Sequence, residues 1–592
     1  MISGNTLLSR NTRISRFGLL AVILAGSIMT GCGRDEAPVE EVADRSQTVS
    51  RPNILLMVVE DLSPRVGAFG DPVARTPNLD RLAAEGVRYT NVFTTAGVCA
   101  PSRAALMTGM YQQSIGAQHM RTSSFGRSRS GELGTFTTPG PPYQTVPPPE
   151  VKAFPELLRA AGYFTINNVK TDYQFGEPFT VWDVHDGGAT LRDRAPDKPF
   201  LIMHSNSLTH ESSLFRSEWV SMPERAVRAA ERNAVRRAEL DVRTDPAEVE
   251  VPRFLPDTTA VREELAILYD NVSQMDAWVG ERLAELEAEG LADDTIVIWT
   301  TDHGDGLPRA KRSIYDSGIK VPMIIRFPDG RDAGAVVDNL ISFVDLAPTL
   351  LELARAPVPG HMHGRNFLAD SVAKREYVYA ARDRLDELPD KSRAVRDRQY
   401  KYIRNYVPRR PFFAPLYFRE NLSSMAEMRR LLEAGELPEH IAGYFTTPRP
   451  AEELYDVLAD PDEVHNLAAD PGHGDTLLRL GAELDRWLET VGDMSDRPES
   501  QMVDEMWHGG RQPVTAAPLV SVDCSGDDAV VDLSSPTPGA SIGFRVVDSD
   551  DTRWQLAGAD LSIAKGQTIE SKAVRYGYQE SRVLRQELCP DS

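Results

Sequence analysis

Three continuous apolar runs constrain the fold of this chain more than any other feature of its sequence. They cover residues 53–59 (NILLMVV), 199–203 (PFLIM) and 295–300 (TIVIWT). A run without polar alternation is typical of a β-strand that is buried on both faces, as in a parallel sheet. Such a sheet needs a layer of helices on each face. The runs therefore predict an α/β fold built on a large, mostly parallel sheet that lies between helices.

Amphipathic helices are expected between these strands. A helix start follows the first run at residues 76–82 (TPNLDRL), and apolar residues recur at three- and four-residue spacing from Leu265 to Leu286 until Gly290 ends the pattern. In open sheets of this type, ligands bind beyond the carboxyl ends of the strands. The polar residues directly after the three runs are therefore the first candidates for a functional site.

Carboxylates and imidazoles follow all three runs. Glu60 and Asp61 follow the first, His210 comes soon after the second, and Asp302 and His303 follow the third. Taken alone, an aspartate after a strand usually caps a helix. Taken together, these residues predict an oxygen-rich site for a hard divalent cation, provided that the three strands are neighbours.

The net charge excludes one broad class of function. The 592 residues include 87 acidic and 65 basic ones, which gives a formal net charge of −22. Binding to nucleic acid without sequence preference depends on an excess of lysine and arginine, so we expect no nucleic-acid partner. The length predicts several domains.

The first 51 residues are expected to serve export. Residues 1–31 are typical of a signal peptide, because arginines precede an apolar run that is too short to cross a bilayer. The run ends in MTGC, which resembles a bacterial lipoprotein processing site, so that Cys32 would be lipidated and residues 32–51 would form a tether. The alternative is ordinary signal cleavage beside an incidental cysteine. We expect an exported lipoprotein, anchored to a membrane surface in the periplasm or at the outer membrane.

Residues 99–103 (CAPSR) resemble the sulfatase modification motif Cys-x-Pro-Ser-Arg, in which the cysteine is oxidised to formylglycine. The alternative for Cys99 is a buried free thiol. Further segments resemble sulfatases in order and spacing: 51–61, 76–86, 106–109 (LMTG), 301–304 (TDHG), 317–322 (SGIKVP), 343–350 (FVDLAPTL) and 453–456 (ELYD). The resemblance covers roughly residues 50 to 490 and implies an alkaline-phosphatase-like fold. It also implies a maturation partner, either a formylglycine-generating enzyme or an anaerobic sulfatase-maturating enzyme.

The resemblance implies hydrolysis of sulfate esters, with sulfated glycans as the expected substrates. In sulfatases the formylglycine derived from the motif cysteine, here Cys99, is hydrated to a metal-bound gem-diol. One hydroxyl attacks sulfur and displaces the alcohol, which leaves a covalent sulfo-enzyme intermediate. The other hydroxyl then loses its proton and expels sulfate, and the aldehyde is regenerated. Two alternatives stay open: a phosphate or phosphonate monoester hydrolase of the same superfamily, and an inactive lipoprotein that binds sulfated polysaccharide.

The family pattern implies a metal site with Ca²⁺ as the expected ion and Mg²⁺ as the alternative. Glu60 stands where many members have aspartate, and His303 where many have asparagine. His303 is therefore also a candidate for hydrogen bonding to the sulfate. The implied ligands are Glu60, Asp61, Cys99, Asp302 and His303.

The family pattern also implies residues that act on the substrate. Lys170 and Lys311 would bind sulfate oxygens, His210 would lie near the leaving oxygen, and Arg103 would stabilise the gem-diol. Asp172 stands where sulfatases carry a histidine, so the base of the elimination step is either Asp172 or His119. A structural or substrate-rim role is the alternative for His119.

The rest of the chain divides into smaller units. We expect a catalytic α/β domain at 52–375 and a smaller α+β subdomain at 376–493, where alternating charged and apolar residues predict antiparallel strands. Most arginines of these strands are expected in surface ion pairs, and some around a pocket for a polyanionic sugar. A polar linker at 494–518 would lead to a small β-sandwich at 519–592. Because the protein is expected to be exported, we also expect a disulfide between Cys524 and Cys589, which flank this module.

Overall fold

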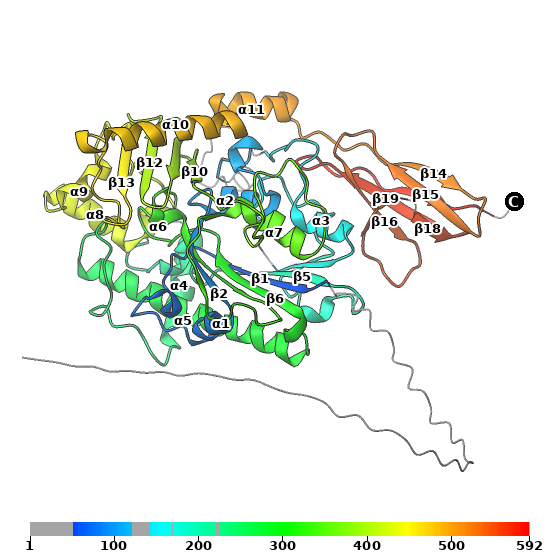
Figure 1. Cartoon of the computed structure of the whole chain (residues 1–592), viewed down its shortest axis with the longest axis horizontal. Coiled ribbons are helices and arrows are strands. Elements are labelled where there is room, and N and C mark those ends of the chain that lie inside the picture. Colours follow the sequence, from blue (N-terminus) through cyan, green and yellow to red (C-terminus); the bar gives the residue numbers. More distant parts are fainter. Residues whose placement is uncertain (1–50, 121–142, 169, 221–223, 560, 591–592) are drawn as a thin grey trace, which may run out of the picture. The chain divides into compact units, whose positions relative to one another are not determined.

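The computed structural model describes residues 51–120, 143–168, 170–220, 224–559 and 561–590 (Figure 1). The predicted signal peptide, Cys32 and residues 32–50 of the predicted tether lie outside these ranges. Within the described ranges, no helix is both long enough and apolar enough to pass through a membrane. Export and lipidation stay predictions.

Nine of the described strands form one mixed sheet, in which the three apolar runs lie side by side at the centre. Strand β1 lies between β5 and β6 and is parallel to both, so the predicted mostly parallel α/β fold is confirmed. Strand β7 is the exception, because it runs antiparallel to β6 and β2. In spatial order the strands are β4 (Val184–His185), β3 (Phe164–Asn168), β5 (Phe200–Asn206), β1 (Asn53–Val59), β6 (Thr295–Thr301), β7 (Lys320–Arg326), β2 (Val87–Phe93) and β8 (Val336–Val337), with β9 (Ile341–Ser342) paired to β2.

Helices cover both faces of this sheet, as the apolar runs require. Successive residues of β1 point to opposite faces. Leu55 and its alternate neighbours pack with α1 (Pro77–Glu85) and α5 (Thr259–Ala288). Leu56 and its alternate neighbours pack with α2 (Cys99–Thr108), α3 (Phe154–Ala160) and α7 (Leu346–Leu353). No side chain of residues 54–59 is more than 1% exposed, so this strand is fixed from both sides.

A second, antiparallel sheet follows the large one in the order β10-β11-β12-β13. The prediction that most arginines of this region form surface ion pairs is wrong for Arg382, Arg384 and Arg393, because these side chains are at most 4% exposed. Arg393 instead pairs with Asp383 and Asp493 in the interior. Alternation predicted the strands but could not show that distant parts of the chain bury the charged side chains. The elements are β10 (Val378–Arg382), β11 (Ser392–Arg396), β12 (Tyr400–Asn405), β13 (Glu452–Asp456), α8 (Ser423–Ala434) and α10 (Gly474–Val491).

The segment 494–518 also differs from the predicted polar linker. It contains helix α11 (Glu499–Met506), and Met502 in this helix is fully buried. Glu499 accepts hydrogen bonds from the Tyr143 hydroxyl at 2.9 Å and from Arg384 Nε at 2.7 Å. The segment is therefore fastened to the rest of the protein. Apolar residues are too few in an eight-residue helix to produce a recognisable period.

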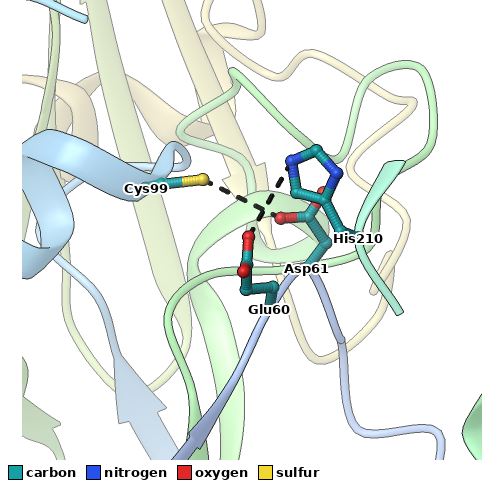
Figure 2. Close-up of side chains that lie close together, drawn as sticks. All are labelled: Glu60, Asp61, Cys99 and His210. Atoms are coloured by element: carbon teal, nitrogen blue, oxygen red, sulfur yellow. Dashed lines mark hydrogen bonds and ion pairs between the residues drawn. The ribbon is translucent and has the colours of Figure 1, made fainter. Parts of the chain in front are cut away.

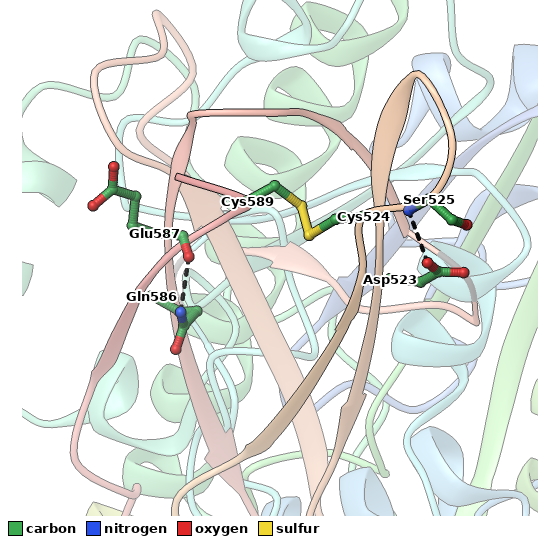
Figure 3. Close-up of a disulfide and its surroundings, with 6 residues drawn as sticks. All are labelled: Asp523, Cys524, Ser525, Gln586, Glu587 and Cys589. Carbon is green, nitrogen blue, oxygen red and sulfur yellow. Dashed lines mark hydrogen bonds between the residues drawn. A yellow bond between two sulfur atoms is a disulfide. The ribbon is translucent and has the colours of Figure 1, made fainter. Parts of the chain in front are cut away.

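The C-terminal module consists of two small antiparallel sheets that enclose an apolar core. This arrangement agrees with the predicted β-sandwich. A disulfide joins Cys524, just after β14, to Cys589, just after β20, with Cα atoms 5.8 Å apart (Figure 3). One sheet contains β14 (Leu519–Asp523), β15 (Asp528–Ser534) and β18 (Leu561–Ala564), and the other contains β17 (Gln555–Leu556), β16 (Ser541–Val546), β19 (Thr568–Val574) and β20 (Leu584–Glu587).

Candidate active site

The parallel strands β1, β5 and β6 end at one edge of the sheet, and the residues that follow them converge there. One group of potential ligand atoms, all within 4.8 Å of one another, comes from Asp61, Cys99, Asp302 and His303. Glu60 and His210 join Asp61 and Cys99 in an overlapping group. Figure 2 shows Cys99 pointing toward Asp61 and His210 pointing toward Glu60. The structure thus brings together six residues that the sequence predicts for one site.

Asp61 occupies the centre of the cluster. It follows β1 directly, its backbone is left-handed (φ 52°), and its backbone N–H donates to Asp302 Oδ1 at 3.1 Å. Its Oδ2 accepts from the backbone N–H of Glu211 at 2.8 Å and also contacts Lys311 Nζ. Burial favours the protonated acid, but Lys311 and the nearby histidines outweigh burial and hold the pKa of Asp61 well below its ordinary value. Asp61 is therefore a carboxylate, as a ligand for a cation must be.

Helix α2 presents two residues of the modification motif to the cluster. Cys99 begins the helix, is 2% exposed, and places its Sγ 3.3 Å from His303 Nε2 and 4.0 Å from Asp61 Oδ1. Among the described residues it is the one free cysteine. One helical turn later, Arg103 Nε donates to Asp302 Oδ2 at 3.0 Å, and both side chains are fully buried. The spacing of four residues places both side chains on the same face of the helix.

His303 has one ring nitrogen fixed by the backbone. Its Nδ1 lies 2.9 Å from the carbonyl oxygen of Gly304, which can only accept, so Nδ1 carries the proton. Nε2 then faces Asp61 Oδ1 at 3.1 Å and Asp302 Oδ1 at 3.6 Å. Burial alone would lower the pKa of His303, but Asp302 and Asp61 raise it to about 10. The geometry accommodates both predicted roles, a neutral ligand and a cationic hydrogen-bond donor.

Two lysines, of which Lys311 is buried and Lys170 partly buried, bring positive charge to the same place. Lys170, after β3, contacts Glu60 and lies 3.6 Å from Asp302 Oδ2, and Lys311 is 1% exposed beside Asp61. Burial opposes the charged form of Lys170, but the negative groups around it raise its pKa well above the ordinary value. Asp172 lies 3.6 Å from Lys170, and its side chain is 41% exposed. The lysines therefore stay charged and suit the oxygens of an anion.

The donor set fits a hard divalent cation. Three buried carboxylates converge on Cys99, and oxygen ligands of this kind are those that Ca²⁺ and Mg²⁺ prefer. With His303 neutral as a metal ligand, the positive charges of Arg103, Lys170 and Lys311 balance the three carboxylates in formal charge. A bound divalent cation would add two positive charges and leave the site cationic overall, which favours an anionic substrate.

His119 is not part of this cluster. Its Nε2 lies 4.0 Å from Glu499 Oε2, and its Nδ1 accepts from the backbone N–H of Arg384 at 3.3 Å. Burial lowers its pKa. These contacts fit a structural role, the alternative for His119, better than the role of base.

Sequence reasoning missed a buried ion pair behind the site. Arg312 Nη1 and Nη2 donate to the two carboxylate oxygens of Glu211 at 2.8 and 2.9 Å, and neither side chain is more than 2% exposed. Glu211 follows His210, and Arg312 follows Lys311. The pair therefore ties together two segments that carry predicted substrate-contacting residues. The sequence hints at this pair only through the acidic residue beside His210 and the basic residue beside Lys311.

Replacing Arg312 by methionine is expected to lower the free energy of unfolding by about 3–5 kcal/mol, because buried Glu211 would lose both hydrogen bonds to Arg312 and keep only Lys311 Nζ, 4.0 Å away, as a cationic neighbour. The measurement is urea unfolding of both proteins. Arg398→Met is the matched control: it breaks an exposed pair with Asp338 and should cost less than about 1 kcal/mol. Equal, small losses in the two variants would contradict a buried role for the Arg312 pair.

Comparisons with known proteins agree with this geometry. A family model described as Sulfatase matches residues 52–186 and 182–356, and one described as N-sulphoglucosamine sulphohydrolase, C-terminal, matches residues 309–420. An ulvan-active sulfatase of Formosa agariphila is 39% identical over 96% of this chain and 97% of its own length. The chain belongs to the sulfatase family. The resemblance drawn from residues 99–103 and their surroundings is thus confirmed.

Solved structures show the same fold. One, described as a complex with its substrate D-glucosamine-2-N,6-O-disulfate, matches this sulfatase with a TM-score of 0.51 at 18% identity, over 76% of this chain and 100% of the other. Another, a phosphonate monoester hydrolase of Agrobacterium radiobacter, matches with a TM-score of 0.50 at 18% identity, over 75% and 96% of the two chains. The sulfatase fold is therefore shared with an enzyme that is described by a different activity.

Proposed function

We propose that this sulfatase hydrolyses sulfate esters of a sulfated glycan, with formylglycine formed from Cys99 as the nucleophile. The observation that carries the proposal is the buried cluster in which Cys99 meets three carboxylates and two charged lysines. A relative that is 39% identical is ulvan-active, and a solved structure of the same fold holds a sulfated glucosamine. Both support a sulfated carbohydrate as the substrate.

The chain's own residues divide the work of the reaction. Lys170 and Lys311 would hold the oxygens of the sulfate group and neutralise charge as it moves toward the leaving oxygen. His210, whose Nε2 lies 3.8 Å from Glu60 Oε2, would protonate that oxygen. Asp172, partly exposed beside Lys170, is our candidate for the base of the second step.

A metal ion and a modifying enzyme complete this proposal. Glu60, Asp61, Asp302 and His303, with modified Cys99, would hold Ca²⁺, or Mg²⁺ as the alternative, and the ion would lower the pKa of the nucleophilic hydroxyl. Arg103 would keep Asp302 in place through its 3.0 Å contact. Cys99 itself needs oxidation by a formylglycine-generating or anaerobic sulfatase-maturating enzyme. We further propose that Cys32 is the lipid anchor of an exported protein.

Side-by-side assays of sulfate and phosphate release test the function. Protein from a host that matures sulfatases is expected to release sulfate from 4-nitrophenyl sulfate and from ulvan, and to act much more slowly on 4-nitrophenyl phosphate. Dominant phosphate release would make the protein a phosphate monoesterase instead. Tight binding of ulvan with no release of either anion would support an inactive binding protein.

A further inference from the structure

Tyr576 belongs to the C-terminal module in sequence but packs in the catalytic domain. It follows β19, is 1% exposed, and lies in the apolar cluster formed by one face of β1 with α3 and α7. Its hydroxyl donates to Glu156 Oε2 at 2.8 Å and accepts from the backbone N–H of Ala153 at 3.1 Å. Both partners lie at the start of α3, so this side chain is locked into the catalytic domain.

The ring of Tyr576 supports the loop that follows Lys170. It stacks on Phe175 with ring centroids 4.8 Å apart, and Phe175 stacks in turn on Tyr173 at 5.6 Å. The next residue, Gly577, donates its backbone N–H to the carbonyl of Phe175 at 3.1 Å. A side chain at Gly577 would lie 2.2 Å from the carbonyl oxygen of Thr145, so the close approach requires glycine.

The supported loop, residues 170–176, has a backbone that needs support. Asp172 and Gln174 both have positive φ angles, 56° and 66°, which are unfavourable for residues other than glycine. Such conformations persist where the surroundings fix them. Tyr173 between them is 2% exposed, and its ring is the end of the stack that begins at Tyr576. Contacts that the C-terminal module supplies therefore help to fix the shape of the loop.

We propose that Tyr576 is a positioning residue, which holds loop 170–176 so that Lys170 and Asp172 are presented correctly to the substrate. This inference rests on the proposed function, in which Lys170 binds the sulfate group. It assigns the C-terminal module a role in the reaction in addition to any contact with the glycan. A displacement of about 1 Å at a reacting centre can reduce the rate about 100-fold.

A double-mutant cycle separates positioning from stability. Tyr576→Leu removes the stack and both hydroxyl contacts, and it is expected to lower kcat/KM about tenfold when Lys170 is present. In a Lys170→Ala background the same change should lower kcat/KM less than about twofold, because kcat/KM reports the steps up to loss of the alcohol, in which Lys170 acts, whereas Asp172 is proposed to act in the second step. Tyr576→Phe keeps the stack and should restore most of the activity. Equal losses in the two backgrounds would overturn the proposal.

Ile563→Ala is the matched control, since Ile563 lies in the module's own core and not in the cluster that contains Tyr576. It should weaken the module, as thermal unfolding would show, and leave kcat/KM nearly unchanged. Hydrogen exchange of the amides in 170–176 gives a readout that needs no turnover. We expect faster exchange in Tyr576→Leu and not in Ile563→Ala. Unchanged exchange in Tyr576→Leu would contradict the positioning role. A wild-type protein without sulfatase activity would contradict only the proposed function.

Discussion

Cys99→Ala is expected to abolish sulfate release, with a loss of about 10⁴-fold or more, because it removes the only proposed nucleophile. Cys99→Ser should be inactive in turnover as well, since a serine lacks the second hydroxyl that would expel sulfate. The measurement is the rate of sulfate release by ion chromatography, with the wild-type protein prepared in the same host.

Stability measurements make this result interpretable. Cys99 begins α2 and is 2% exposed, so replacing this one small side chain should change the free energy of unfolding by about 1 kcal/mol. A Cys99→Ala protein that folds normally and still turns over at the wild-type rate would rule out the proposed nucleophile.

Removal of divalent cations is expected to have the second-largest effect, a loss of at least about 100-fold in kcat. The reason is that Glu60, Asp61 and Asp302 form a buried cluster of carboxylates suited to a hard cation, which would lower the pKa of the nucleophilic hydroxyl. The measurement is activity after chelation and dialysis, followed by titration with Ca²⁺ and separately with Mg²⁺. We expect Ca²⁺ to restore activity at the lower concentration.

Two aspartates with left-handed backbones provide a matched pair of variants for this titration. Asp61→Asn and Asp172→Asn each remove one charge beside a lysine, and asparagine tolerates the positive φ at both positions. Only Asp61→Asn should raise the Ca²⁺ concentration needed for half-maximal activity. Full activity after exhaustive chelation, or the same shift in both variants, would contradict the assigned metal site.

The central fold was predictable because burial leaves a direct trace in sequence. The run 53–59 has no polar residue after Asn53, and that pattern is typical of a strand covered on both faces. Applied to all three runs, the rule that ligands lie at strand ends predicts that Glu60, Asp302 and His210 share one site. Their convergence required only that β5, β1 and β6 be neighbours, as they are.

Contacts between distant segments were not predictable in the same way. Arg312 and Glu211 are separated by 101 residues, and the charges beside Lys311 and His210 could equally have faced solvent. Tyr576 looked like an ordinary residue of a small β-sandwich, because nothing in its own segment shows that the catalytic domain surrounds it. Helix α11 was missed since Met502 is its one fully buried residue.

Mass spectrometry of the peptide that contains Cys99, taken from active protein purified from its native host, tests the account most directly. Among the described residues Cys99 is the one cysteine without a disulfide, so its state can be assigned without ambiguity. We predict an aldehyde in place of the thiol, seen as the mass of formylglycine or of its hydrate, in a proportion that tracks specific activity. A fully active preparation in which Cys99 is entirely an unmodified thiol would contradict the account.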